Sequence, residues 1–128
     1  MNLGDFMRKL ADDIGGTYST FNKLSILAYP MPNGELQNVF GSVINTTDTE
    51  MIGFTSNVNK WDMKTDFKGL LEFNHHQCYA KVTISGDNIY VAAVTVARYT
   101  SEVQMAEMIY EVARVANQLT KVINKDYN

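Results

Sequence analysis

The stretch from Gly69 to Val96, GLLEFNHHQCYAKVTISGDNIYVAAVTV, sets the architecture that we expect of this chain. It begins with the end of a short helix and continues into a strand at residues 79–84, where apolar and polar side chains alternate. Residues 85–88, SGDN, are typical of a tight turn, and a second strand follows at residues 89–96. Because this second strand is apolar on both faces, we expect it to be central in the sheet or covered on both sides.

Helices are predicted on both sides of this stretch. Residues 3–14 have apolar side chains at helical spacing, and two glycines suited to a left-handed cap follow them. A short helix is predicted over residues 66–74 from the same spacing. Ser101 begins a long amphipathic helix, with Gln104 at the spacing of a capping box. The apolar stripe of that helix consists of Met105, Ile109, Val112, Ala116, Leu119 and Ile123.

Three further strands are predicted between the first two helices. They cover residues 20–29, 36–44 and 51–56, and short polar loops join them. The loop at residues 30–34, PMPNG, contains the Asn-Gly pair that is a strong hairpin signal. Strands that are close in sequence and joined by short loops usually pair in an antiparallel meander. Alternation places Leu36, Phe40 and Ile44 on a shared face of the second of these strands.

The order of elements predicts an α+β fold, α-β-β-β-α-β-β-α, with an antiparallel five-stranded sheet and flanking helices. A length of 128 residues fits one domain, residues 1–128. A hydrophobic content of 45% and a charged content of 20% are ordinary for a soluble globular protein. The net charge of -3 argues against nucleic acid as a partner, since neutralising phosphates takes an excess of Lys and Arg.

Membrane and secretory signals are missing from the sequence pattern. No apolar run approaches the roughly 20 residues of a membrane-spanning helix. The N-terminal MNLGDFMRKLADD contains acids and lacks the apolar centre of a signal peptide. Cys78 is the single cysteine, which cannot form an internal disulfide and favours a reducing compartment. We therefore expect a cytoplasmic protein with no membrane partner.

One short segment could carry chemistry. His75, His76 and Cys78 contain metal-ligand types, but neighbouring side chains on an extended chain point apart and a zinc site needs four ligands. His76 and Cys78 could act as base and nucleophile, although no oxyanion-hole or nucleophile-elbow motif accompanies them. A buried structural cysteine is the better interpretation of Cys78. We expect no catalytic residue, no metal and no cofactor.

A family resemblance extends over residues 50–123. Its residues are Ser56–Val58, Leu70–Asn74, Ala80–Ile84, the Gly86-Asp87 turn, and Ala113, Ala116, Asn117 and Leu119 of the last helix. With the order of elements, they resemble the class I type III secretion chaperone fold, and more closely its YbjN-like relatives. The chain lacks the leucine-rich, strongly acidic late helix of the secretion chaperones.

The resemblance implies a bacterial, non-enzymatic protein that is chaperone-like or regulatory. Secretion chaperones of this fold are homodimers that bind an extended protein segment in apolar surface grooves, so a protein partner and a homodimer are expected here. Candidate partner-binding residues are Trp61, Phe67, Leu71, Tyr79 and Tyr90. For Trp61, the only tryptophan, a partly buried anchoring role is the structural alternative.

Two other functions stay open. The first is a small-ligand sensor with a pocket between the sheet and the helices near Trp61. The second is an enzyme that uses His76 and Cys78, which requires an accessible and reactive thiol.

Overall fold

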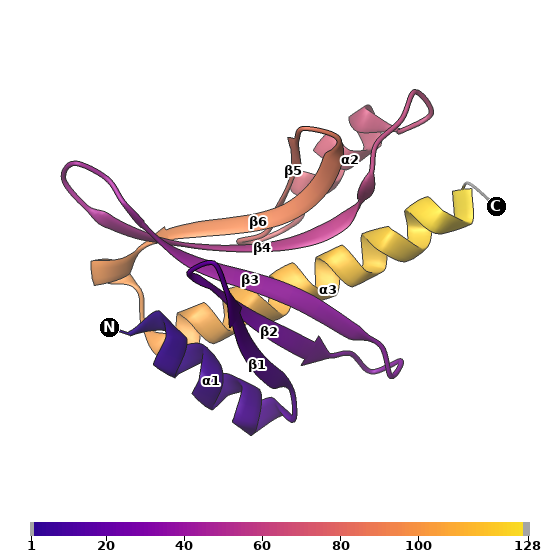
Figure 1. Ribbon diagram of the computed structural model, residues 1–128. Helices are drawn as coiled ribbons and strands as arrows, with labels where there is room; N and C mark the ends of the chain where they lie inside the picture. Colours follow the sequence, from indigo (N-terminus) through magenta and orange to yellow (C-terminus); the bar gives the residue numbers. More distant parts are fainter. Residues whose placement is uncertain (1, 127–128) are drawn as a thin grey trace.

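The computed structural model describes the backbone of residues 2–126 and the side chains of residues 2–123. Within these residues, six strands form one antiparallel sheet in the order β1-β2-β3-β4-β6-β5 (Figure 1). The α+β class is therefore confirmed, and the prediction of five strands is wrong by one. The elements are α1 (Leu3–Ile14), β1 (Thr17–Phe21), β2 (Leu24–Pro30), β3 (Leu36–Asn45), β4 (Glu50–Lys60), α2 (Phe67–Asn74), β5 (Lys81–Ser85), β6 (Asn88–Val96), the 3-10 turn η1 (Ala97–Tyr99) and α3 (Glu102–Asp126).

The additional strand arises where a single strand over residues 20–29 is predicted. The chain reverses at Asn22 and Lys23, whose φ angles of 48° and 68° lie in the left-handed region. β1 and β2 then pair through a two-residue turn, with Phe21 opposite Leu24. Such turns need positive φ at both central residues, and glycine or asparagine usually supplies it. Lysine at the second position gives no turn signal, which explains the error.

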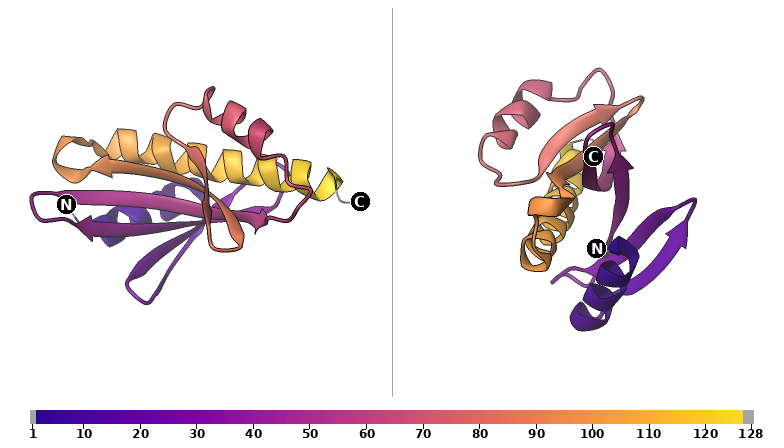
Figure 2. Two further views of the ribbon diagram at one scale, coloured as in Figure 1. Left: turned by 90° about the horizontal axis from the view of Figure 1, so that it is seen from above. Right: turned by 90° about the vertical axis from the view of Figure 1, so that its left-hand side faces the viewer.

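The helices α1 and α3 cover one side of the sheet (Figure 2). α1 packs on β1 and β2, whereas α3 crosses β3, β4 and β6. The core on this side includes Leu27, Val39, Phe54 and Val91, which are fully buried. Gly41 allows the close approach of α1, because a Cβ there would lie 2.5 Å from the Met7 sulfur. Of the helices in the described residues, none lies over the opposite side, which the views of Figure 2 show clear.

We call this second side of the sheet the open face. One row of paired residues, Ser19, Ile26, Phe40, Thr55, Ala92 and Lys81, crosses all six strands on it. The predicted shared face of Leu36, Phe40 and Ile44 belongs to it, since side chains two apart on a strand point the same way.

β6 meets one of the two alternatives that the sequence predicts for it. It pairs with β4 and β5, so it lies inside the sheet, one strand from the edge. Ile89, Val91 and Ala93 are buried on the helix side. Val94 points to the open face and is 54% exposed. Within the described chain, β6 is therefore an inner strand, as the first alternative predicts, and it is covered on one face only, so the second alternative is not met.

The predicted helices are confirmed with their caps. Asn2 caps α1 by accepting from the Asp5 N–H at 3.0 Å, and Gly15 ends it with φ 75°. Ser101 accepts from the Gln104 N–H at 3.1 Å at the start of α3. The predicted apolar stripe of α3 is buried in full. None of the helices in the described part of the chain combines the length and the hydrophobicity that crossing a membrane requires.

Candidate functional site

An apolar cavity of about 400 Å³ lies between α2 and the C-terminal half of α3. We call it the α2–α3 groove. Leu119 and Ile123 are its buried residues, and Val122 is half exposed. Lys64, Asp66 and Gln118 add polar groups. The apolar lining consists of Leu70 and Phe73 from α2 and Leu119, Val122 and Ile123 from α3.

Two side-chain contacts position α2 as one wall of this groove. Asp66 caps the helix by accepting from the Gly69 N–H at 2.9 Å. At the other end, the Asn74 side chain accepts from the Val82 N–H at 2.5 Å and donates to the Val82 carbonyl at 3.2 Å. The amide of Asn74 thus bonds to the outer strand β5 as a neighbouring strand would. The end of α2 is thereby fixed to the edge of the sheet.

Trp61 holds the beginning of α2. Its indole Nε1–H donates to the Gly86 carbonyl at 2.8 Å, and its backbone N–H donates to the Asp87 carbonyl at 3.0 Å. The Phe67 ring meets the indole edge-on with centroids 5.9 Å apart. Trp61 therefore connects the chain before α2 to the turn between β5 and β6, as an anchor does. Its indole is 39% exposed, so part of it stays accessible.

The five predicted partner-binding residues lie in three places. Trp61, Phe67 and Leu71 come together around α2, where Leu71 is 68% exposed. Tyr79 lies in the segment before β5, and its hydroxyl donates to Glu107 on α3 at 3.2 Å. Tyr90 lies on the open face, opposite Asn57 and Thr83. The structure therefore does not join these five residues in one surface.

Residues 119–123 of the groove were not predicted as site residues. Leu119 and Ile123 belong to the apolar stripe of α3, which the sequence marks as core. The available signal was Val122, an apolar residue flanking that stripe at a position that stays exposed. Only the placement of α2 beside α3 turns these residues into a groove.

Glu111 fixes the segment that enters β5. Its Oε1 accepts from the backbone N–H groups of Tyr79 at 2.8 Å and of Ala80 at 2.7 Å. Desolvation raises the pKa of the Tyr79 phenol, and the hydrogen bond to Glu107 raises it further. Tyr29, at the other end of the helix side, has its pKa raised by burial and by the nearby Tyr110. These groups support the packing of α3, and neither tyrosine lines the groove.

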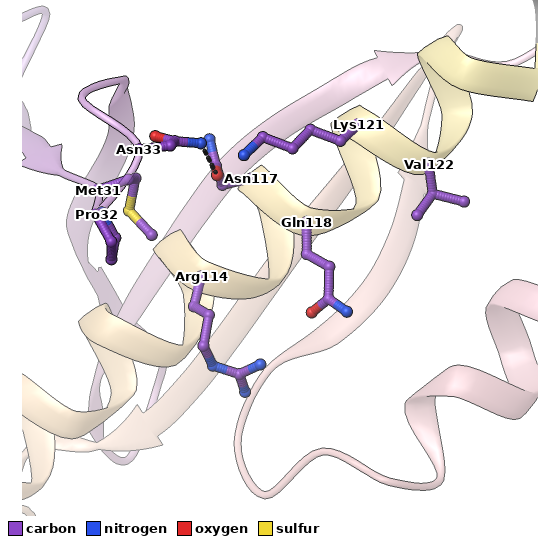
Figure 3. A pocket seen from close by; sticks show the side chains of 8 residues that line it. All are labelled: Met31, Pro32, Asn33, Arg114, Asn117, Gln118, Lys121 and Val122. Atoms are coloured by element: carbon purple, nitrogen blue, oxygen red, sulfur yellow. Dashed lines mark hydrogen bonds between the residues drawn. The ribbon is translucent and has the colours of Figure 1, made fainter.

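A second cavity of about 470 Å³ lies on the other side of α3. Figure 3 shows Asn33 and Asn117 facing each other there, joined by a hydrogen bond of 3.5 Å. Asn117 is buried and also donates to Glu35 and to Gln37 at 3.4 and 3.3 Å. The cavity shares Gln118 and Val122 with the α2–α3 groove. Its lining is more polar in residue type: Met31, Pro32, Asn33, Arg114, Asn117, Gln118, Lys121 and Val122.

The segment between α2 and β5 contains the residues considered for chemistry. Cys78 is exposed, so the prediction of a buried cysteine is wrong. The predicted strand at residues 79–84 begins later, at Lys81, and leaves Cys78 in an irregular segment outside the sheet. His75 and His76 are exposed, with rings edge-on and centroids 5.6 Å apart. Nowhere in the described residues do three or more His, Cys, Asp or Glu side chains converge as metal ligands would.

The α2–α3 groove offers apolar contact with a few polar groups beside it. This arrangement can take up one or two apolar side chains, with the Asp66 carboxylate and the Lys64 ammonium among the polar groups of its lining. No protein-family model matches the chain, and no curated protein matches it.

Proposed function

We propose that this chain is a non-enzymatic protein-interaction module that binds a segment of another protein in the α2–α3 groove. It acts in the cytoplasm, as a homodimer, in a chaperone-like or regulatory role. The observation that carries the proposal is the apolar cavity of about 400 Å³ beside the half-exposed Val122. The resemblance to YbjN-like proteins and class I type III secretion chaperones favours the same kind of function.

The groove fits an amphipathic segment that inserts apolar side chains. Helical segments dock in this way through residues at i, i+3 and i+4, and extended segments through alternate residues. Each inserted Leu, Ile or Phe side chain gains about 1.5–3 kcal/mol by leaving water. Two such anchors, after the cost of ordering the segment, correspond to a weak and reversible complex.

Selection of peptides tests the groove directly. A display library of short random peptides is selected on the wild-type protein, and the enriched peptides are measured by calorimetry. We expect them to share two apolar residues at helical or strand spacing. We expect Val122→Glu to weaken their binding at least about tenfold, since it places a carboxylate in an apolar contact. Val122 is half exposed, so this variant should still fold.

The matched control is Val103→Glu. Val103 is a valine of the same helix, 71% exposed and outside the groove. Its substitution should leave peptide affinity unchanged. If no peptide is enriched, or if both variants lose binding equally, the groove does not bind protein segments.

A small-ligand sensor is the second candidate, because the groove volume of about 400 Å³ lies within the roughly 300–1,000 Å³ typical of ligand pockets. The site differs from the expected one, since Trp61 does not line this cavity. A thermal-shift screen of metabolites tests this function. A stabilising compound whose effect disappears in Val122→Glu supports the sensor, and a flat response across the screen contradicts it.

A further inference from the structure

The open face carries apolar side chains that the chain itself does not cover. Phe21 is 65% exposed and Leu36 is 63% exposed, one on β1 and one on β3. Val94 on β6 is 54% exposed, and Ile44 on β3 is 43% exposed. Exposed apolar residues are ordinary when they are scattered, but these four share one side of the sheet, whereas Val43 and Ile84 are the exposed large apolar strand residues on the helix side.

Ile44 and Val94 form a continuous patch across β4. They flank Gly53, where a Cβ would lie 3.3 Å from the Ile44 Cδ1 and 3.9 Å from the Val94 Cγ2. Gly53 itself is buried beneath these side chains, although no helix lies above it in the described chain. Met51 and Val96, paired with each other, continue the patch along the same strands. The open face is therefore apolar toward the β3–β4 turn, where the Ser42 hydroxyl, 4.0 Å from the same Cβ position, is the neighbouring polar group.

The sequence of β6 also has apolar residues on the open face. Its residues at 90, 92, 94 and 96 are Tyr, Ala, Val and Val, and they face the open side. A strand with one solvated face usually alternates apolar and polar residues, whereas a strand covered on both faces is apolar throughout. β6 has the apolar composition of a strand that is covered on both faces. Within one chain, however, only one of its faces is covered.

Charge on the open face is confined to its rim. In the strands, all of which the structure describes, the charged side chains of this face are Lys60, at the last residue of β4, and Lys81, on the outer strand β5. The Lys81 ammonium donates to the carbonyls of Asn74 at 2.9 Å and Gln77 at 2.7 Å. A face without acids and with rim lysines offers no pattern for a charged partner, and it opposes an identical face with little repulsion.

The size of the open face suits a dimer. With about 3.3 Å per residue and about 4.8 Å between strands, a six-stranded sheet of these strand lengths presents about 750 Å² on one face. Stable interfaces bury about 800 Å² per partner. Twofold symmetry, by far the commonest arrangement of homo-oligomers, joins identical patches. Packed sheets lie about 10 Å apart, so facing side chains can interdigitate.

We propose that a second copy of this chain docks on the open face, so that the two sheets stack face to face about a twofold axis. The inference rests on the self-association part of the proposed function and specifies its surface. The helices α1 and α3 then form the two outer layers of the assembly. β6 becomes covered on both faces, as its composition requires.

Light scattering coupled to size-exclusion chromatography, and sedimentation equilibrium, test the proposal on the full chain. We expect the wild-type protein to have twice the 14.4 kDa chain mass. Val94→Lys and Ile44→Lys each place a cation in the apolar patch that flanks Gly53 on the open face. Each should raise the dimer dissociation constant at least about a hundredfold. Both residues are partly exposed, so circular dichroism should show folded monomers.

Two control variants separate the open face from other surfaces. Val43→Lys changes the neighbour of Ile44 in the same strand, which points to the helix side and is 41% exposed. Val103→Lys changes an exposed valine on α3. Both should remain dimers. A monomeric wild type overturns the proposal, and so does a dimer that Val94→Lys and Ile44→Lys leave intact, which would place the interface elsewhere, for example at the free edge of β1.

The two proposals can fail separately. Val122→Glu should lose peptide binding and keep the dimer, because the α2–α3 groove is on the helix side. Val94→Lys should lose the dimer and keep peptide binding. If Val122→Glu keeps peptide binding, the α2–α3 groove has been assigned wrongly. If Val94→Lys keeps the dimer, the open face has been assigned wrongly.

Discussion

One carboxylate oxygen of Glu111 accepts hydrogen bonds from two backbone N–H groups, a role that a neighbouring strand would otherwise have. The N–H groups of Tyr79 and Ala80 both donate to it, and Ala80 is fully buried. A buried donor without a partner costs about 1–3 kcal/mol, and bonds to a charged acceptor are stronger than neutral ones. This contact therefore determines where the segment before β5 rests on α3.

Replacing Glu111 with Ala should lower the free energy of unfolding by about 2 kcal/mol, because the Ala80 N–H loses its acceptor. Urea denaturation followed by circular dichroism measures the change. The matched control is Glu107→Ala, one turn earlier, whose carboxylate accepts from the exposed Tyr79 hydroxyl. That control should cost less than about 1 kcal/mol. Equal losses in the two variants would show that the backbone contacts of Glu111 have no special weight.

Single residues account for the errors of the sequence interpretation. Hydrophobic periodicity shows which side of a helix or strand is apolar. It carries no information about the two-residue turn at Asn22 and Lys23. The same limit applies to Cys78, which we expect to be buried next to a strand that starts at residue 79, whereas that strand begins at Lys81 and Cys78 is exposed. In both cases the backbone conformation near the end of an element decides whether a residue lies in the strand or outside it. Sequence patterns are least informative at the ends of elements.

Of the three α-helices in the described residues, α2 is the one with the least burial against the rest of the fold. No residue of this helix is fully buried. Its attachments are the contacts of Trp61 and Phe67 at the beginning, Leu70 and Phe73 against the core, and Asn74 at the end. Segments with few buried apolar contacts open with free energies well below that of global unfolding. A mobile α2 could admit a partner segment to the α2–α3 groove.

Trp61→Ala should release α2 without unfolding the sheet. Hydrogen exchange followed by NMR should show the α2 amides exchanging at least about tenfold faster, while the amides of α3 keep their protection. The physical reason is the loss of the ring contact with Phe67 and of the bond to Gly86. Tyr99→Ala, which removes an aromatic ring that is 74% exposed, is the control and should leave α2 unchanged. A uniform loss of protection would instead make Trp61 part of the global core.

The three helices and most strand positions could be predicted from the sequence, because each has a strong period and clear caps. The α2–α3 groove could not, since the apolar residues of its two walls are 46 (Phe73 to Leu119) to 53 (Leu70 to Ile123) residues apart in the sequence. Their approach depends on how the connection through β5 and β6 returns α3 across the sheet. The open face could not be predicted either, because the composition of β6 predicts a strand that is central or covered on both sides, and only the structure shows its uncovered face.

At the scale of the whole molecule, helices on one side only give the sheet two distinct sides. The helix side contains the α2–α3 groove and the second cavity, which Asn117 lines, and the other side is the open face. A dimer that stacks the open faces leaves the α2–α3 groove of each copy accessible on its outer surfaces. One partner protein with two binding segments could then engage both, and the second contact would benefit from a high effective concentration.

The proposed dimer should respond to salt as an apolar association does. Each chain has a net charge of -3, so screening reduces the repulsion between the two copies. With only rim lysines on the open face, no ion pair within the interface is weakened in return. Sedimentation equilibrium at about 50 mM and about 500 mM NaCl should therefore give a dissociation constant that is unchanged or lower at high salt. A dimer that weakens tenfold or more, about 1.4 kcal/mol, would depend on ion pairs and would have to use a charged surface, such as the outer sides of the helices.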